Sequence, residues 1–348
     1  MSDIINIQKK LLPDMLLVMQ KRYQILRSIY FAEPVGRRTL AQMLGMSERV
    51  LRGEVEFLKA QGLIGIAPAG MTVTKDGLVV FRELESVMNQ LTGIHTMEDR
   101  LREKLKIKAC FVVQGDSDVT PWVLEEMGRV ALEQLDISLT EKKNTIAVMG
   151  GSTMATLAEM MTPDFANGRE LLFVPGRGGL GEDLNNQANT ICDRMATKTN
   201  GKHRMFYVPE QLGEEAYQSL LKEPAIQEGL RLVQSANAIL HGIGDAMTMA
   251  QRRHTNAETM QKITDRQAVG EAFGYYFNEQ GEVVYKVPTF GLQFEDLPRI
   301  PNIIALAGGT SKAKAIKSYM KTAPTHTILV TDEGAATMLL KGENTLLK

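Results

Sequence analysis

Hydrophobic and polar positions follow two different patterns along this chain of 348 residues. Up to about residue 88 the apolar side chains recur at helical spacing: Leu51, Val55 and Leu58 lie at i, i+4 and i+7 and form one buried stripe. From residue 107 onwards, short continuous apolar runs alternate with amphipathic segments. The first pattern predicts a small, mostly helical domain. The second predicts a mostly parallel, doubly wound α/β sheet whose strands are covered on both faces.

The bounds of the expected elements follow from these patterns and from the positions of glycine, proline and capping residues. In the first part, helices are expected over residues 7–31, 37–44, 47–60 and 74–88, and short strands over 63–66 and 71–74. In the second part, strands are expected over residues 107–113, 145–149, 171–174, 204–208, 238–240, 283–287, 303–306 and 327–330. Between the two parts, the acidic and basic side chains of residues 89–105 predict a solvated linker helix.

Residues 37–60 have the layout of a helix-turn-helix. Gly45 permits a tight turn between the two helices, and Ser47 is the expected N-cap of the second. On that second helix, Arg49 and Arg52 lie near the N-terminal end, on the side opposite the buried stripe. A recognition helix meets base edges in the major groove at these positions, and a guanidinium group pairs with two acceptors of guanine at once. The strand pair over 63–74 adds a wing beside the helix.

The helix pair alone leaves two readings open, because such pairs are common and exposed charges are often only solvated. The wing favours DNA binding, and so does the distribution of charge. Residues 1–90 carry 12 Lys and Arg against 9 Asp and Glu, whereas the remainder carries 28 against 32. The candidate DNA-binding residues are Arg37, Arg38, Ser47, Glu48, Arg49, Arg52, Glu56 and Lys75.

A short pattern occurs twice in the second part. Residues 146–154 read I-A-V-M-G-G-S-T-M, and residues 304–312 read I-A-L-A-G-G-T-S-K. Each is a strand-like run that ends in two glycines, followed by two hydroxyl residues and the start of a helix. The free N–H groups and partial positive charge of a helix N-terminus bind anions such as phosphate. Such joints also occur simply as tight turns, but two of them at the carboxyl ends of parallel strands are expected to line one cleft.

Cationic side chains near the strand ends fit the same cleft. Arg177 lies in the loop P-G-R-G-G-L-G over residues 175–181, where its planar guanidinium suits a phosphate, and Gln187 is expected to support it. Lys312 follows the second Gly-Gly pair. Each side chain has a plain alternative role as a loop or surface residue. Together, the cations and the two turns fit a ligand with two phosphates.

Composition argues against several other classes of protein. The five histidines are scattered and no CxxC motif occurs, so we predict no metal site and no cofactor. The two cysteines, Cys110 and Cys192, are expected to be buried free thiols. No apolar run approaches the ~18 residues of a membrane span, and no signal pattern is present at the start of the chain. We therefore expect a soluble, cytoplasmic protein with no membrane partner.

The order of helix, helix-turn-helix, wing and long phosphate-cradling domain resembles the SorC/DeoR-type sugar-responsive bacterial transcription regulators. The segment S-E-R-V-L-R-x-E-V-x-F-L-K-x-Q-G-L-I, residues 47–64, is similar to the recognition helix and wing entry of that family, and the similarity extends over essentially the whole chain. The resemblance implies a winged helix-turn-helix domain over 1–88, a linker helix over 89–105, and an effector-binding and oligomerisation domain over 106–348. The last domain is implied to share the α/β fold of sugar-phosphate isomerases and deaminases.

The resemblance also implies the roles of individual residues. The first Gly-Gly turn holds an effector phosphate, one of two arginines after the loop H-G-I-G-D-A-M-T-M-A binds the effector, and Glu271 accepts a sugar hydroxyl. Spacing favours Arg252 over Arg253. The implied effector is fructose-1,6-bisphosphate, and the implied protein is a repressor of central glycolytic genes that binds double-stranded operator DNA as a homo-oligomer, a dimer or a tetramer. The candidate effector-binding residues are Gly150, Gly151, Ser152, Thr153, Arg177, Gln187, Arg252, Glu271, Gly308, Gly309 and Lys312.

A sugar-phosphate isomerase or deaminase of the same fold is the alternative, because fold alone does not fix function. Its catalysis would need an acid and a base at the strand ends. Asp245 and Glu271 are the only obvious candidates, and no histidine–carboxylate arrangement is evident near them. In addition, a winged helix-turn-helix domain has no role in the reaction of an isomerase. We therefore predict a regulator with no catalytic residue.

Overall fold

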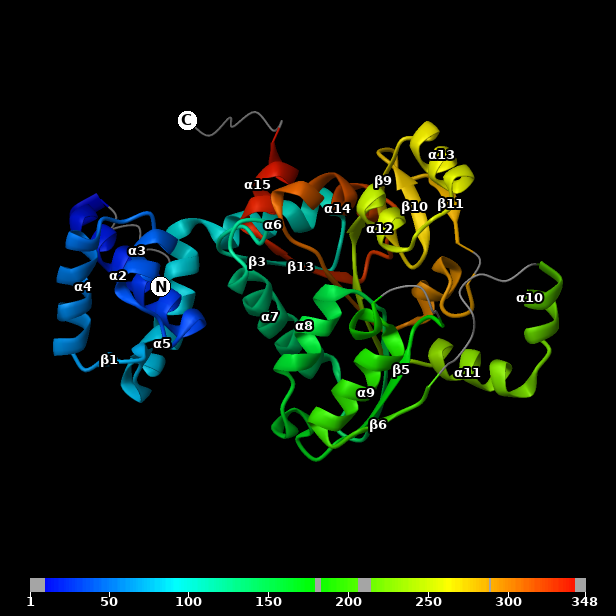
Figure 1. Cartoon of the computed structure of the whole chain (residues 1–348), viewed down its shortest axis with the longest axis horizontal. Helices are drawn as coiled ribbons and strands as arrows, with labels where there is room; N and C mark the ends of the chain where they lie inside the picture. Colours follow the sequence, from blue (N-terminus) through cyan, green and yellow to red (C-terminus); the bar gives the residue numbers. More distant parts are fainter. Residues whose placement is uncertain (1–9, 179–182, 206–213, 288, 342–348) are drawn as a thin grey trace. The chain divides into compact units, whose positions relative to one another are not determined.

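The computed structural model describes residues 10–178, 183–205, 214–287 and 289–341, and Figure 1 shows the whole chain. Two compact units make up the chain, Met1–Thr96 and Met97–Lys348. Within the described ranges, no helix is both long and apolar enough to cross a membrane. The parts of the predictions that concern residues 7–9, 179–181 and 206–208 lie outside the described residues.

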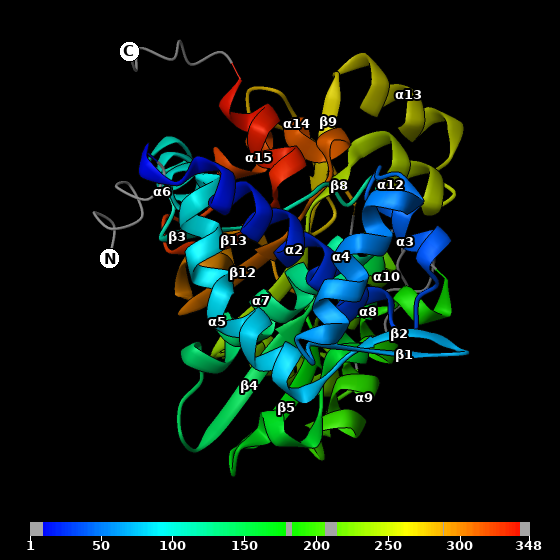
Figure 2. The same ribbon diagram turned by 90° about the vertical axis from the view of Figure 1, so that its left-hand side faces the viewer.

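The first unit is a helical domain with a two-stranded wing, as predicted. The hairpin is antiparallel and pairs Ile64 with Val73, and Figure 2 shows it beside α4, the second helix of the predicted helix-turn-helix. The elements are α2 (Pro13–Ala32), α3 (Arg37–Met43), α4 (Glu48–Ala60), β1 (Ile64–Ala67), β2 (Gly70–Val73) and α5 (Lys75–Thr92); α6 (Ile94–Leu105) follows and contains the boundary between the two units.

The predicted stripe on α4 lies at the centre of this unit's core. Leu51 and Val55 are 0% exposed and belong to the same buried cluster as Ile29 of α2. Burying one such side chain contributes roughly 1.5–3 kcal/mol. Ser47 caps the helix, because its side chain accepts a hydrogen bond from the Val50 N–H at 3.4 Å. The buried stripe fixes the opposite side of α4 as its solvent face.

An extended segment after α2 supports the wing. The Val35 N–H donates to the Met71 carbonyl at 3.1 Å, and the Met71 N–H donates to the Val35 carbonyl at 2.8 Å. Glu33 accepts a hydrogen bond from the Val73 N–H at 2.6 Å. Gly70 permits this close approach, because a Cβ atom there would lie 2.8 Å from the Val35 nitrogen. The wing is therefore joined to the end of α2 as well as to α4.

The helix predicted to end near Met88 is longer than expected. It continues to Thr92 and ends at Gly93, which adopts a left-handed φ of +79° and donates its N–H to the Asn89 carbonyl. Leu91, in a sequence that looks polar, is only 7% exposed and joins the domain core. Burial of that one side chain accounts for the extra turn of helix.

The second unit is built on a parallel sheet of seven strands. Its strands are β3 (Ala109–Val113), β4 (Lys143–Val148), β5 (Glu170–Pro175), β6 (Lys202–His203), β7 (Ala238–Gly242), β12 (Asn302–Leu306) and β13 (Thr327–Asp332). The accompanying α-helices are α7 (Trp122–Ser138), α8 (Ser152–Met160), α9 (Ala188–Thr199), α10 (Glu214–Leu220), α11 (Pro224–Gln234), α14 (Ala313–Met320) and α15 (Glu333–Leu340). Short 3₁₀ helices are η1 (Pro163–Ala166), η2 (Leu184–Asn186), η3 (Phe294–Arg299) and η4 (Thr310–Lys312).

The strand order is β3-β13-β12-β7-β4-β5-β6, and all the pairings are parallel. Apolar side chains of α7, α8 and α9 pack on one face of the sheet, in a cluster that includes Met127, Leu157 and Cys192. This confirms the predicted doubly wound α/β architecture. Both cysteines are buried and free, as expected.

A four-stranded antiparallel sheet is inserted in the chain between β7 and β12. Its strand order is β11-β10-β9-β8, and Tyr276 pairs with Tyr285 across two of its strands. The prediction that residues 283–287 belong to the parallel sheet was therefore wrong. The elements are β8 (Gly244–Asp245), α12 (Ala246–Arg252), α13 (Ala257–Asp265), β9 (Ala268–Ala272), β10 (Tyr275–Asn278) and β11 (Val283–Lys286), all drawn in yellow to orange in Figure 1.

Candidate effector pocket and DNA-binding face

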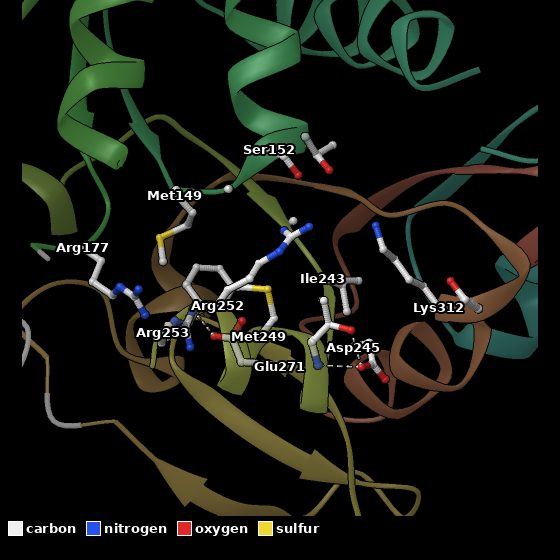
Figure 3. Close-up of a pocket in the computed structure, with 18 residues that line it drawn as sticks. Met149, Ser152, Arg177, Ile243, Asp245, Met249, Arg252, Arg253, Glu271 and Lys312 are labelled. Carbon is white, nitrogen blue, oxygen red and sulfur yellow. Dashed lines mark hydrogen bonds and ion pairs between the residues drawn. The ribbon is translucent and has the colours of Figure 1, made fainter. Parts of the chain in front are cut away.

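A pocket of about 370 Å³ lies between the carboxyl ends of the parallel strands and the inserted sheet. Its lining comes from the turns after β4, β5 and β7, from α12, from β9 and from η4, and Figure 3 shows these side chains around one cavity. Sheets of this kind bind ligands at this edge. Predicted residues that line the pocket are Gly150, Gly151, Ser152, Thr153, Arg177, Arg252, Glu271 and Lys312, whereas Gln187, Gly308 and Gly309 are not among its lining residues.

The first Gly-Gly turn presents an open helix end to the pocket. Gly151 has a φ of +119°, which requires glycine, and α8 begins at the next residue with no side-chain cap. Gly150 permits close packing, because a Cβ atom there would lie 2.7 Å from the carbonyl oxygen of Asn186. The helix dipole and the hydroxyls of Ser152 and Thr153 therefore face the cavity, an arrangement that binds an anion.

The second Gly-Gly turn is already occupied by carboxylates of the chain itself. Asp332 accepts hydrogen bonds from the Gly309 N–H at 2.6 Å and from the Ser117 hydroxyl at 2.6 Å. Asp116 accepts the hydroxyl hydrogen bond of Thr310 at 2.6 Å, and Asp118 accepts the N–H of Ser311 at 2.7 Å.

These carboxylates take up the anion-binding donors of the second turn. Burial acts to raise the pKa of Asp116, but the hydrogen bonds from Thr310 and from the Asp118 N–H outweigh it, so the pKa lies below its usual value. Asp116 therefore stays charged at neutral pH. From this turn, only the residues that follow the glycines, Ser311 and Lys312, reach the pocket.

Lys312 places an ammonium group at one side of the cavity. Burial lowers the pKa of Lys312, the charge of Asp118 opposes this shift, and the charge of Arg252 adds to it. Figure 3 shows Lys312 and Arg177 on opposite sides of the cavity. Arg177 is positioned by an antiparallel bridge to Gly291, which precedes η3. The pocket thus has a cation on each side.

Glu271 forms the floor of the pocket together with an arginine that sequence reasoning passed over. Arg253 contacts the Glu271 carboxylate at 3.1 Å, and the two side chains are only 8% and 5% exposed. The same carboxylate oxygen accepts the Gly274 N–H at 2.6 Å, and Arg253 also donates to the Tyr276 hydroxyl at 3.4 Å. Arg253 is the C-cap of α12, so its side chain turns inward, whereas Arg252 is exposed. The spacing in the sequence favours Arg252 as the effector-binding arginine, and it gives no sign of the ion pair that Arg253 forms with Glu271.

The two remaining titratable groups beside the pocket have structural roles. Asp245 caps α12, because it accepts the Thr248 N–H at 2.9 Å and the Thr248 hydroxyl at 2.8 Å. His241 is fully buried behind the cavity and contacts the Tyr319 hydroxyl at 3.2 Å. Burial lowers the pKa of His241 to about 4, although a hydrogen bond to Gly242 and the charge of Glu271 oppose the shift. The imidazole is therefore neutral near pH 7.

The candidate DNA-binding residues lie on the surface of the first unit. Arg49 and Arg52 project from the solvent face of α4, opposite its buried stripe. Glu54 of the same helix forms ion pairs with Lys21 at 2.5 Å and Arg22 at 2.9 Å, which join α4 to α2. The pKa of Glu54 is lowered, since these ion pairs outweigh the opposing effect of burial. All the candidate DNA-binding residues predicted from the sequence are exposed: Arg37, Arg38, Ser47, Glu48, Arg49, Arg52, Glu56 and Lys75.

Comparison with known proteins covers both units. Residues 18–88 match the "CggR N-terminal DNA binding domain", and residues 89–341 match the "Putative sugar-binding domain". The chain is 54% identical to the central glycolytic genes regulator of Bacillus subtilis (strain 168), over 99% of this chain and 100% of that protein. The crystal structure of "the putative SorC family transcriptional regulator from Enterococcus faecalis" is 49% identical, with a TM-score of 0.67, and covers 71% of this chain and 100% of that one.

This chain belongs to the SorC family of DNA-binding, sugar-responsive transcriptional regulators.

A full-length SorC family member also shares the fold. The sorbitol operon regulator of Klebsiella pneumoniae has a TM-score of 0.64 at 18% identity and covers 91% of this chain and 97% of that one. The matches confirm the prediction of a DNA-binding regulator rather than an enzyme. In this SorC family member, the described residues contain no group of three or more His, Cys, Asp or Glu that could hold a metal ion.

Proposed function

We propose that this chain represses genes of central glycolysis and is released from its operator by fructose-1,6-bisphosphate bound in the pocket. The name of the Bacillus subtilis relative supports the choice of genes. The two-sided arrangement of charge in the pocket supports the choice of ligand. A hexose with a phosphate at each end matches a cavity that has a cation on each side.

The two sides differ in chemistry, and this difference suggests how the ligand is held. One phosphate lies at the open N-terminus of α8, within reach of Ser152, Thr153 and Lys312. The other lies against Arg177, since a guanidinium group can donate two parallel hydrogen bonds to a phosphate, whereas the guanidinium group of Arg252 extends towards Ser152 and the first phosphate (Figure 3). Between them, Glu271 accepts a sugar hydroxyl, while Arg253 compensates its buried charge.

The proposed response to the ligand is a shift between two states of the regulator. The effector can weaken DNA binding only if it binds the DNA-free state more tightly than the DNA-bound state. On DNA, we propose that the chain acts as a homodimer that assembles into a tetramer, because a pseudo-palindromic operator reflects a two-fold symmetric protein. No cofactor besides the sugar phosphate takes part.

Calorimetry on the full chain tests the identity of the ligand. Fructose-1,6-bisphosphate is expected to bind at least about tenfold more tightly than fructose 6-phosphate or fructose 1-phosphate, because each monophosphate loses one set of charge-assisted hydrogen bonds. Equal affinity for a monophosphate would contradict the two-phosphate arrangement. Inorganic phosphate and unphosphorylated fructose serve as controls, and both are expected to bind weakly.

Fluorescence anisotropy on a labelled duplex tests the response. The duplex is first selected from a random pool by the wild-type chain, so that its sequence need not be assumed. Saturating fructose-1,6-bisphosphate is expected to weaken binding of that duplex, and sedimentation of the complex gives the stoichiometry. An unchanged affinity would contradict release by this sugar, even if calorimetry detects binding.

A further inference from the structure

Gly53 occupies the middle of the exposed face of the recognition helix. It lies four residues after Arg49 and three before Glu56, so these two side chains border it on one side, and the exposed Val50 and Phe57 border it on the other side of the same face of α4. The buried stripe of the helix faces the opposite way. Glycine is a poor choice for such a site, because in the interior of a helix it is less favourable than any residue except proline.

Two other helical glycines of this chain, Gly77 and Gly128, have a visible reason. In α5, a Cβ atom on Gly77 would collide with the carbonyl oxygen of Leu63, next to the wing. In α7, a Cβ atom on Gly128 would lie 2.6 Å from the sulfur of Met160, at the contact with α8. In both cases close packing within the chain excludes any side chain, and the loss of helix propensity is offset by that packing.

At Gly53, by contrast, no close packing with the described part of the chain explains the choice of glycine. No described heavy atom outside its own stretch of helix lies within 4 Å of the position that its Cβ atom would take. Its backbone is helical and does not have the left-handed φ that favours glycine elsewhere in this chain. A constraint on the side chain at this position would therefore come from outside the chain, from a partner that approaches this face.

The face identifies the partner. Two exposed arginines, Arg49 and Arg52, lie on the solvent side of the same helix, and the match to a DNA-binding domain covers the whole of α4. An α-helix fits the major groove of B-DNA closely, and base edges lie at the bottom of that groove. We infer that Gly53 lets the backbone of α4 settle against base edges of the operator, closer than any residue with a side chain allows, so that Arg49 and Arg52 reach their bases. This inference rests on DNA binding and is independent of the identity of the effector.

If Gly53 has this role, its replacement should change the stability of the domain and its affinity for DNA in opposite directions. Replacing it by alanine adds one methyl group, which favours the helix and so stabilises the folded domain. The same methyl group holds the helix away from the bases. A residue whose only role is structural would change both properties in the same direction.

The test uses the full chain with Gly53→Ala and Gly53→Leu. Both variants are expected to melt at the same temperature as the wild type or higher, because alanine and leucine are good helix formers. Affinity for the duplex selected by the wild-type chain is expected to fall by roughly tenfold for Gly53→Ala, a loss comparable to that caused by one mismatched base pair, and further for Gly53→Leu. Affinity for a scrambled duplex, in which contacts are mainly to phosphates, is expected to change little.

Ala60→Gly is the matched control. Ala60 lies two turns further along the same exposed face, at the C-terminal end of α4, away from the end that reads bases. This variant is expected to melt at a lower temperature but to keep the preference for the selected duplex. The inference is overturned if Gly53→Ala binds the selected duplex as tightly as the wild type. It is also overturned if Gly53→Ala loses affinity equally on both duplexes, since the methyl group would then meet the phosphate backbone and not the bases. Circular dichroism confirms that each variant is folded.

Discussion

The carboxylate of Asp332 lies 2.6 Å from the backbone nitrogen of Gly309. This contact separates two turns that have nearly the same sequence. At the first turn, α8 begins with no side-chain cap and its N-terminus opens into the pocket. At the second turn, the chain supplies its own anion, because the carboxylate of Asp332 accepts the Gly309 N–H. The two turns therefore differ in structure: the first opens into the pocket, and the second joins β12 to β13.

Removal of the Asp332 side chain should destabilise the second unit. Its carboxylate accepts hydrogen bonds from Gly309, from Ser117 and from the Ala335 N–H, and it is 0% exposed. Asp332→Ala is expected to lower the free energy of unfolding by roughly 3 kcal/mol or more, because several buried donors lose their partner. Urea unfolding measures this, with the exposed Asp265→Ala as control. A loss as small as that of the control would show that the carboxylate is not needed there.

Lys312→Ala should weaken effector binding and leave DNA binding intact. The ammonium group is half-buried at one side of the pocket, so a loss of roughly 1.5–3 kcal/mol in binding of fructose-1,6-bisphosphate is expected by calorimetry. Lys314→Ala is the control, since Lys314 lies two residues on but is exposed and pairs with Glu279 at 3.0 Å. Unchanged affinity in Lys312→Ala would remove this residue from the site.

The adjacent arginines Arg252 and Arg253 should behave differently when replaced. Arg253→Ala leaves the buried carboxylate of Glu271 without its ion-pair partner, so a loss of about 3–5 kcal/mol in the free energy of unfolding is expected. Arg252→Ala removes an exposed side chain and should change stability little while it weakens effector binding. Chemical denaturation and calorimetry on the same pair of variants separate the two roles. Equal stability of both variants would argue against the buried ion pair.

Arg52→Ala should reduce the discrimination between operator and random DNA. If Arg52 reads a guanine, the selected duplex should lose roughly 1–3 kcal/mol of binding free energy relative to a scrambled duplex. Lys59→Ala, at the C-terminal end of the same helix, is the control and should affect both duplexes equally. Fluorescence anisotropy at several salt concentrations gives the affinity of each variant for the selected duplex and for the scrambled duplex. An equal loss on both duplexes for Arg52→Ala would mean that this arginine contacts only phosphate.

The buried His241 should make the protein less stable in mild acid. Burial lowers its pKa from 6.5 to about 4 in the folded state. Between these values the unfolded chain binds a proton that the folded chain does not, so the free energy of unfolding falls as the pH falls. In that window, His241 lowers the free energy of unfolding by at most about 1.4 kcal/mol for each pH unit. Above the window, His241 causes no dependence of stability on pH. Urea unfolding at several pH values should therefore show a shallower slope for His241→Asn than for the wild type. An identical slope would contradict the depressed pKa.

The sequence was informative wherever neighbouring residues decide the structure. The stripe of Leu51, Val55 and Leu58 and the cap at Ser47 depend only on local spacing, and the structure contains both. The parallel strands could also be predicted, because a strand covered on both faces needs a continuous apolar run. The prediction of an exposed arginine face on α4 follows from the same helical periodicity.

What the sequence could not reveal depends on distant residues or on unusual backbone. Asp332 and the loop at Asp116 are brought to the second Gly-Gly turn only by the fold. From the motif alone, the second turn therefore cannot be distinguished from the first. The hairpin between β9 and β10 turns at Phe273, a bulky residue with a φ of +57°, which no turn rule anticipates. Arg253 differs from Arg252 only because α12 ends between them.

The inserted sheet gives the pocket a wall that is continuous in the sequence. Residues 243–287, between β7 and β12, carry Asp245, Arg252, Arg253 and Glu271, whereas the open helix end at Ser152 belongs to the parallel sheet. Recombination that replaces this stretch would therefore exchange these four pocket side chains together and leave the turn at Ser152 unchanged.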